Sequence, residues 1–370
     1  MIYQNIKDIF MNRNSKNAFL RKKLRRIWSI PIVRIISVLL GIAIVAVSLI
    51  SVFNKNAEPA EESLLTDISE AESANIPESV PEEVSEEPVI ALPTPWRFTG
   101  ADNLNSVIAS DYGIIINATT RQVLGGKNYT QRIYPASMTK IMTLIVAVQS
   151  GIDINTEYLM DYRLINKYYL AGASMSGILA GDTVTFKDLL YGAVLLSAAD
   201  ATAAIAEMVA GSEEEYVKLM NSTAAELGCH DSHFTNTSGL YDTANYSTLG
   251  DIALMLDYAM SIPLAREILS TADYTTPPTD KNPEGYYFFS TMFTRIDHDS
   301  IPGMTVLGGK TGYLAETKHC LASMAVGDNG EKFIVVTAGG AKYDPIDDCI
   351  DLYTRYYGES NETRQSETVR

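Results

Sequence analysis

The chain has 370 residues, of which 46% are hydrophobic and 20% are charged, with 24 glycines and 14 prolines. This is the composition of a globular protein, and it excludes collagen-like, wholly disordered and disulfide-scaffold proteins. The formal net charge of −16 argues against a nucleic-acid binder, because an acidic surface repels a phosphate backbone.

The N-terminal part of the chain is basic and then uncharged. Residues 1–34 hold nine Lys or Arg residues and one acid, Asp8, and an apolar stretch follows from Ile35 to Phe53. As a helix, with a rise of about 1.5 Å per residue, this stretch reaches about 28 Å, close to the thickness of a bilayer core. We therefore expect a basic cytoplasmic segment over 1–34 and an uncleaved transmembrane signal anchor over 35–53. The chain would be a single-pass protein of the cell membrane, with all later residues outside the cytoplasm.

Two alternatives stay open for the apolar stretch. A cleaved signal peptide normally has a shorter apolar region, roughly 7 to 15 residues, and a small-residue cleavage site, which is not evident after Phe53. A buried helix of a soluble domain seldom runs this long without a polar face, and 35–53 has none.

The charge then reverses along the chain. Residues 54–98 are rich in Glu, Pro, Ser and Ala and carry eleven acids against Lys55 and Arg97. Such a segment cannot bury enough apolar surface to offset its ordering entropy, so we expect a disordered acidic tether. Residues 99–358 are long enough for one sizeable domain, and residues 359–370 read as a polar tail.

Periodicity and turn signals predict an α+β domain. A helix opening at Pro135 and running to Gln149 is apolar nearly all round, which indicates a buried central helix. An antiparallel sheet flanked by helices, with an all-helical middle, accounts for the order of the segments. The expected strands are 113–117, 122–124, 304–310, 320–326 and 333–338, and the further expected helices are 189–196, 201–209, 213–227 and 344–357.

The first candidate for chemistry is Ser137-Met138-Thr139-Lys140, because residues at i and i+3 share one face of a helix. A serine is a poor nucleophile until a base takes its proton, and burial favours the neutral amine that can act as that base. The Ser137 N–H, at the start of the helix, can face a developing oxyanion. Taken alone this motif is weak, and a capping Ser with a solvated Lys is the default interpretation.

Two further segments carry candidate residues. Lys310-Thr311-Gly312 ends an expected strand, where a fixed ammonium, a hydroxyl and a small residue suit a carboxylate. Ser197 lies in the sequence between Lys140 and Lys310, at a break between two helices, where its default role is helix capping. The ordered trio carries more weight than any member.

With these three motifs the chain resembles the low-molecular-mass penicillin-binding proteins, the serine D-alanyl-D-alanine carboxypeptidases of the peptidase S11 family. The resemblance runs from about Ala109 to Tyr357 and implies a β-lactamase/transpeptidase-like fold. It implies that Ser137 is the acylated nucleophile, that Lys140 is its base and that Ser197 belongs to the proton relay. Lys310, Thr311 and Gly312 would bind the substrate carboxylate, and the backbone N–H groups of Ser137 and Tyr313 would form the oxyanion hole.

The resemblance implies a peptidoglycan stem peptide as substrate and β-lactams as covalent inhibitors, without a cofactor or metal. The chain departs from the family at the middle motif, S-x-N, whose Asn aligns with Ala199. Asp200 is no simple replacement, because one step along a helix turns a side chain by about 100°. A weakly active or non-catalytic wall-binding homologue is therefore the alternative. A β-lactamase is disfavoured, because no E-x-x-L-N segment lies between Ser197 and Lys310.

Other reactive residues are interpreted as structural. His230 and His233 lie close together in sequence but lack a second ligand cluster, so a metal site is not expected. The three cysteines, Cys229, Cys320 and Cys349, are an odd number, and we expect small buried residues rather than thiol nucleophiles.

Overall fold

The computed structural model describes residues 91–368, and their side chains as far as residue 358. The expected cytoplasmic segment, the expected signal anchor and most of the expected tether lie outside the described residues. Within 91–368, no helix is both long enough and apolar enough to cross a bilayer.

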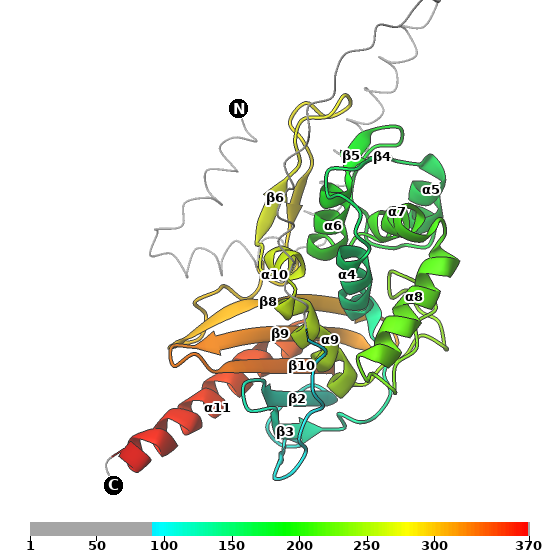
Figure 1. Ribbon diagram of the computed structural model, residues 1–370. Coiled ribbons are helices and arrows are strands. Elements are labelled where there is room, and N and C mark those ends of the chain that lie inside the picture. Colours follow the sequence, from blue (N-terminus) through cyan, green and yellow to red (C-terminus); the bar gives the residue numbers. More distant parts are fainter. Residues whose placement is uncertain (1–90, 369–370) are drawn as a thin grey trace, which may run out of the picture. The chain divides into compact units, whose positions relative to one another are not determined.

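A six-stranded sheet forms the base of the domain (Figure 1). The strand order is β1-β3-β2-β10-β9-β8, and every neighbouring pair is antiparallel except β1 with β3. The strands are β1 (Asp102–Asn103), β2 (Tyr112–Asn117), β3 (Gln122–Lys127), β8 (Met304–Leu314), β9 (Lys318–Gly327) and β10 (Lys332–Gly340). The hairpin of β2 and β3 thus pairs through β2 with β10, which lies more than about 200 residues later in the sequence, and β8 is left at the edge.

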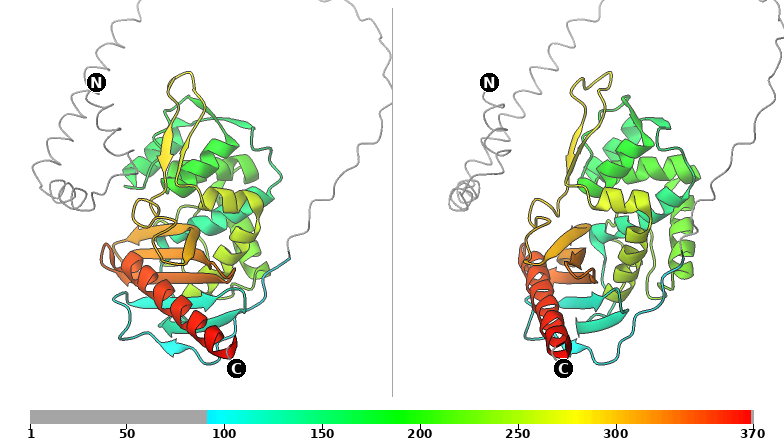
Figure 2. Two further views of the ribbon diagram at one scale, coloured as in Figure 1. Left: turned by 90° about the vertical axis from the view of Figure 1, so that its left-hand side faces the viewer. Right: turned by 60° about the vertical axis from the view of Figure 1, so that its left-hand side comes forward.

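Helices cover both faces of this sheet, and the alternation of side chains along each strand explains why. Ile114 and Ile116 of β2 join the larger hydrophobic core with the central helices, whereas Ile115 joins a second core. That second core includes Leu352 and Tyr353 of α11 (Asp344–Thr368). Figure 2 shows α11 against one face of the sheet and the remaining helices on the other side.

The helical part is built around α4 (Lys140–Gln149), whose residues from Lys140 to Ala147 are all buried. This confirms the central helix expected from its apolar sequence. Thr185 and Asp188 form a capping box at the start of α6 (Phe186–Leu195). The other elements are η1 (Ala136–Thr139), β4 (Glu157–Leu159), α5 (Tyr162–Leu170), β5 (Thr183–Thr185), α6 (Phe186–Leu195), α7 (Ala199–Ala210), α8 (Glu213–Glu226), α9 (Leu249–Ser261), α10 (Pro263–Leu269), β6 (Asp273–Thr275) and β7 (Tyr287–Phe289).

The structure extends two of the expected elements in ways that bear on the site and on the end of the chain. Strand β8 continues to Leu314, so Lys310-Thr311-Gly312 lies inside the strand and not at its end, because pairing with β9 continues to Lys318. Helix α11 runs past Tyr357 to Thr368, into the expected polar tail, where no proline interrupts it.

The expected tether also ends too late. Trp96 is buried, its indole Nε1 donates to the Gly250 carbonyl at 3.1 Å, and the Arg121 guanidinium stacks on its ring. Arg97 forms a parallel β-bridge with Gln122, the first residue of β3. The segment is acidic on average but contains Trp96, and the burial of this side chain holds the backbone against the domain before residue 99.

Candidate active site

Ser137 and Lys140 lie at the junction of the short 3₁₀ helix η1 with α4. The Lys140 Nζ is 3.3 Å from the Ser137 Oγ. Residues i and i+3 eclipse in a 3₁₀ turn, so the motif spacing brings hydroxyl and amine together. Ala136 adopts a φ of 50°, an unusual conformation for a residue with a side chain, immediately before the serine.

Lys140 has the environment of a neutral amine. It is 2% exposed, and its Nζ donates to the backbone carbonyl of Ser238. Burial and the nearby charge of Lys310 hold the pKa of Lys140 well below its ordinary value, against the opposing effect of Asp200. A lysine that is uncharged near neutral pH can accept the proton of the adjacent serine.

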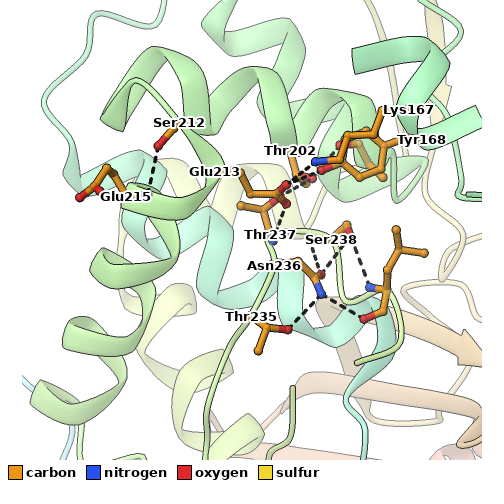
Figure 3. A network of polar contacts seen from close by, with 12 residues as sticks. Lys167, Tyr168, Thr202, Ser212, Glu213, Glu215, Thr235, Asn236, Thr237 and Ser238 are labelled. Atoms are coloured by element: carbon orange, nitrogen blue, oxygen red, sulfur yellow. Dashed lines mark hydrogen bonds and ion pairs between the residues drawn. The ribbon is translucent and has the colours of Figure 1, made fainter. Parts of the chain in front are cut away.

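The loop carrying Ser238 is tied together by the side chain of Asn236, as Figure 3 shows. Its Oδ1 accepts the N–H groups of Ser238 and Gly239 at 3.2 and 2.7 Å, and its Nδ2 donates to the Leu240 carbonyl at 3.1 Å. Gly239 has a φ of 77°, and a Cβ there would lie 1.8 Å from the Ala136 carbonyl oxygen. The loop therefore packs directly on η1 because it has a glycine at this point.

Glu213, at the start of α8, anchors the same loop to the helical layer (Figure 3). Its carboxylate accepts the N–H and hydroxyl of Thr237 at 3.1 and 2.9 Å, the amine of Lys167 at 2.9 Å and the hydroxyl of Tyr168 at 2.7 Å. Burial acts to raise the pKa of Glu213, but these hydrogen bonds outweigh it and hold the pKa below its ordinary value. An ionised carboxylate thus joins α5, α8 and the loop that positions Lys140.

Lys310 and Thr311 lie on β8, which follows η1 in the sequence by about 170 residues. Lys310 is 1% exposed, its Nζ donates to the Thr311 carbonyl at 3.1 Å, and burial lowers its pKa to about 7. The Thr311 hydroxyl lies 2.6 Å from that of Thr291. The charge of Lys310 lowers the pKa of Lys140, as expected for two amines that lie near each other.

Gly312 lets η1 approach β8 closely. A Cβ at Gly312 would lie 3.1 Å from the Ser137 backbone nitrogen and 2.6 Å from the Cys320 Sγ. Because β8 is an edge strand, some of its backbone N–H groups have no strand partner. Tyr313 follows Gly312 on this strand, paired in register with His319. Gly312, the residue before Tyr313, therefore lies close to the backbone nitrogen of Ser137 across the contact of η1 with β8.

Ser197 lies between α6 and α7, as expected. It adopts a φ of 62°, and its buried hydroxyl has no hydrogen-bond partner among the described residues. Both features are typical of functional sites, where strain and an unpaired polar group are retained for a reason other than stability. No hydrogen bond joins Ser197 to Ser137 or Lys140 in the described part of the chain. The helix-capping default is wrong, because Ala198 occupies the N-cap of α7.

The residue after Ala198 is the departure from the family motif. Ala199 is buried in a small apolar cluster with Tyr168 and Ala203. The Asp200 carboxylate points elsewhere and accepts the N–H and hydroxyl of Ser176 at 2.9 and 2.6 Å. Asp200 thus does not take the place of the missing amide, in agreement with the expected rotation along the helix, although its charge still favours protonated Lys140.

Sequence reasoning did not find Glu213, Ser238 or Thr291. None belongs to a short motif, because each contacts the site through a hydrogen bond to a residue from another segment. The Ser212 cap next to Glu213 marks the start of a helix but gives no sign of the contact with Thr237.

The cysteines are buried, as expected, and they are free. Burial raises the pKa of Cys320 to about 12, and it also raises the pKa values of Cys229 and Cys349, so these thiols are poor nucleophiles. Within residues 91–368, no group of His, Cys, Asp or Glu side chains has an arrangement that could hold a metal ion.

The fold is of the β-lactamase/transpeptidase-like class. The structure superimposes on the crystal structure of the Streptomyces K15 DD-transpeptidase with a TM-score of 0.62 and 26% identity, over 69% of this chain and 98% of that chain. A D-alanyl-D-alanine carboxypeptidase from Mycobacterium tuberculosis H37Rv gives a TM-score of 0.58 at 25% identity, over 68% of this chain and 91% of that chain.

The model of one family, peptidase S11, described as D-alanyl-D-alanine carboxypeptidase, matches residues 99–341. The chain belongs to this family. It is 34% identical to the D-alanyl-D-alanine carboxypeptidase DacF of Bacillus subtilis, over 60% of this chain and 56% of that protein. It is 30% identical to the D-alanyl-D-alanine carboxypeptidase of Streptomyces strain K15, over 62% of this chain and 80% of that protein. The chain therefore spans little more than half of the Bacillus relative.

Proposed function

We propose that this protein is a serine-type D-alanyl-D-alanine carboxypeptidase, which removes the terminal D-Ala from peptidoglycan stem pentapeptides and is inhibited by β-lactams. The observation that carries this proposal is the fully buried amine of Lys140, 3.3 Å from the hydroxyl of Ser137. Membership of the peptidase S11 family supports the choice of substrate.

The mechanism begins with the Ser137 Oγ, which attacks the carbonyl carbon of the penultimate D-Ala while its proton passes to the Lys140 Nζ. The developing oxyanion accepts hydrogen bonds from the backbone N–H groups of Ser137 and Tyr313. The amide C–N bond then breaks, and the proton is transferred to the leaving amine of D-Ala, with Ser197 in the relay. Water next attacks the carbonyl carbon of the acyl-serine ester while Lys140 takes its proton. The bond between that carbon and the Ser137 Oγ then breaks, Lys140 returns the proton to the Oγ, and the shortened peptide leaves.

Lys310, Thr311 and Gly312 bind the carboxylate of the terminal D-Ala. The charged form of Lys310 supplies the attraction and the Thr311 hydroxyl donates a hydrogen bond, while Gly312 keeps the strand free of a side chain. Ala199 offers no amide to the acyl-side carbonyl of the substrate. Loss of one such positioned group costs roughly 10² to 10³ in rate, so we expect slow turnover.

We further propose that residues 35–53 anchor the protein in the cell membrane and that the catalytic domain lies outside the cytoplasm. The apolar run, its basic N-terminal flank and the cell-wall substrate support this location.

The test uses the full-length chain purified in detergent. Incubation with penicillin is expected to add one equivalent of mass at Ser137, and a D-Ala-D-Ala pentapeptide is expected to release D-Ala. Ser137→Ala should abolish both, whereas Ser150→Ala at the other end of α4 should abolish neither. Full D-Ala release by Ser137→Ala would contradict the assignment of Ser137 as the nucleophile. A stable adduct without any D-Ala release would favour the non-catalytic alternative, and rapid turnover of penicillin would favour a β-lactamase.

A further inference from the structure

Thr291 lies in the segment after β7, outside every motif of the sequence, yet it contacts the carboxylate-binding strand. Its hydroxyl oxygen is 2.6 Å from that of Thr311, which is within hydrogen-bond distance. Its backbone N–H donates to the Leu195 carbonyl at 3.1 Å, at the end of α6 and two residues before Ser197. Thr291 therefore joins β8 to the helix end that carries Ser197.

The direction of the hydroxyl–hydroxyl bond follows from the chemistry of the substrate. An ionised carboxylate only accepts hydrogen bonds, and a threonine hydroxyl has a single proton. If Thr311 donated that proton to Thr291, it would present only lone pairs to the carboxylate and repel it. The proton of Thr311 is free for the substrate when Thr291 is the donor in their shared bond.

We propose that Thr291 is a positioning residue that acts through Thr311. By donating to the Thr311 hydroxyl oxygen, it turns the Thr311 proton toward the substrate carboxylate. Its backbone hydrogen bond to Leu195 also sets the distance between Thr311 and Ser197. The leaving D-Ala is bound between these two residues. This inference rests on the proposed function, since it takes the D-Ala carboxylate as the ligand of Thr311.

The expected kinetic signature is a weaker interaction with the carboxylate, which is bound both before and during the reaction. Thr291→Val keeps the branched shape and removes the hydroxyl. It is expected to raise KM about fivefold, the equivalent of one neutral hydrogen bond, with little change in kcat. Thr291→Ser keeps the hydroxyl and should restore a KM near that of the wild type.

The experiment is a double-mutant cycle in the full-length protein, with Thr291→Val, Thr311→Val and the double variant. If Thr291 acts through Thr311, the double variant will have the KM and penicillin acylation rate of Thr311→Val alone. If the double variant instead changes KM by the product of the two single-variant factors, the two residues act independently, and this would overturn the proposal. An unchanged KM in Thr291→Val would overturn it too.

Controls separate positioning from general structural damage. Thr294→Val removes a neighbouring exposed hydroxyl, which donates to the Thr291 carbonyl at 3.1 Å, and should leave KM and kcat unchanged. Thr291→Ala supplies a second hydroxyl-free variant if the valine does not fold, as judged by thermal unfolding. Failure of the wild-type chain to release D-Ala would count against the proposed function, whereas independent effects in the cycle count against Thr291 alone.

Discussion

Two buried lysines of the candidate site have lowered pKa values. Burial and the neighbouring charge of Lys310 both disfavour an ammonium at Lys140 and hold its pKa well below the ordinary value. Lys310 is equally buried, and its pKa falls to about 7, so it changes charge near neutral pH. The proposed chemistry needs Lys140 as a neutral base and Lys310 as a charged partner of the carboxylate.

The pKa of Lys310 predicts how substrate binding depends on pH. Its value in the folded protein lies below the ordinary one, so the amine loses its charge as the pH rises through 7. Between pH 6 and pH 9 we expect KM for a D-Ala-D-Ala peptide to rise by about tenfold or more, because roughly 1% of the amine is charged two units above its pKa. Steady-state kinetics over this pH range measure the change in KM. In Lys310→Arg, which stays charged, the rise should vanish, and a flat KM in the wild type would contradict the interpretation.

At the scale of elements, the site depends on how the loop that carries Ser238 packs on η1. Gly239→Ala places a methyl group 1.8 Å from the Ala136 carbonyl oxygen, so the loop must move and withdraw the Ser238 carbonyl from Lys140. We expect a loss of about 10² in penicillin acylation rate and about 2 kcal/mol or more in the free energy of unfolding. Stopped-flow kinetics and denaturant unfolding measure these.

Gly228→Ala is the matched control, because Gly228 also has a positive φ, 82°, but faces open space. It should cost about 1 kcal/mol in stability and nothing in acylation. Equal acylation rates in the two variants would show that the position of the loop does not matter for Lys140.

Glu213 provides a second test of how elements position the base. Glu213→Gln removes the charge that accepts hydrogen bonds from Lys167, Tyr168 and Thr237. We expect the free energy of unfolding to fall by about 1 to 3 kcal/mol and the acylation rate to fall with it, because the loop carrying Ser238 loosens. Glu214→Gln, in the same turn but with an exposed side chain, should change neither quantity by more than about 0.5 kcal/mol equivalent.

At the scale of the whole molecule, the charge pattern predicts a topology. If residues 35–53 are an uncleaved anchor, protease added outside intact spheroplasts should digest the domain beyond residue 98 and leave a protected N-terminal fragment. Immunoblotting with tags at both ends checks this. A soluble secreted domain that lacks its N-terminal tag would instead identify a cleaved signal peptide.

The sequence alone predicted most of the secondary structure and the three motifs, since both depend on neighbours along the chain. The period of apolar residues predicted the buried helix α4, and i,i+3 spacing predicted the contact of Ser137 with Lys140. It did not predict the length of β8 or the packing of Trp96, because these depend on partners from other segments.

What the sequence determined by itself is local: the segregation of charge, the central helix and the order of the reactive residues. Only the tertiary structure decided how those residues are tuned. It brought Lys310 close enough to suppress the charge of Lys140, held Ser197 in a strained conformation with an unpaired hydroxyl, and placed Thr291 beside Thr311. The physical reason is that pKa shifts, strain and hydroxyl orientation arise from burial and from contacts between segments far apart in the chain.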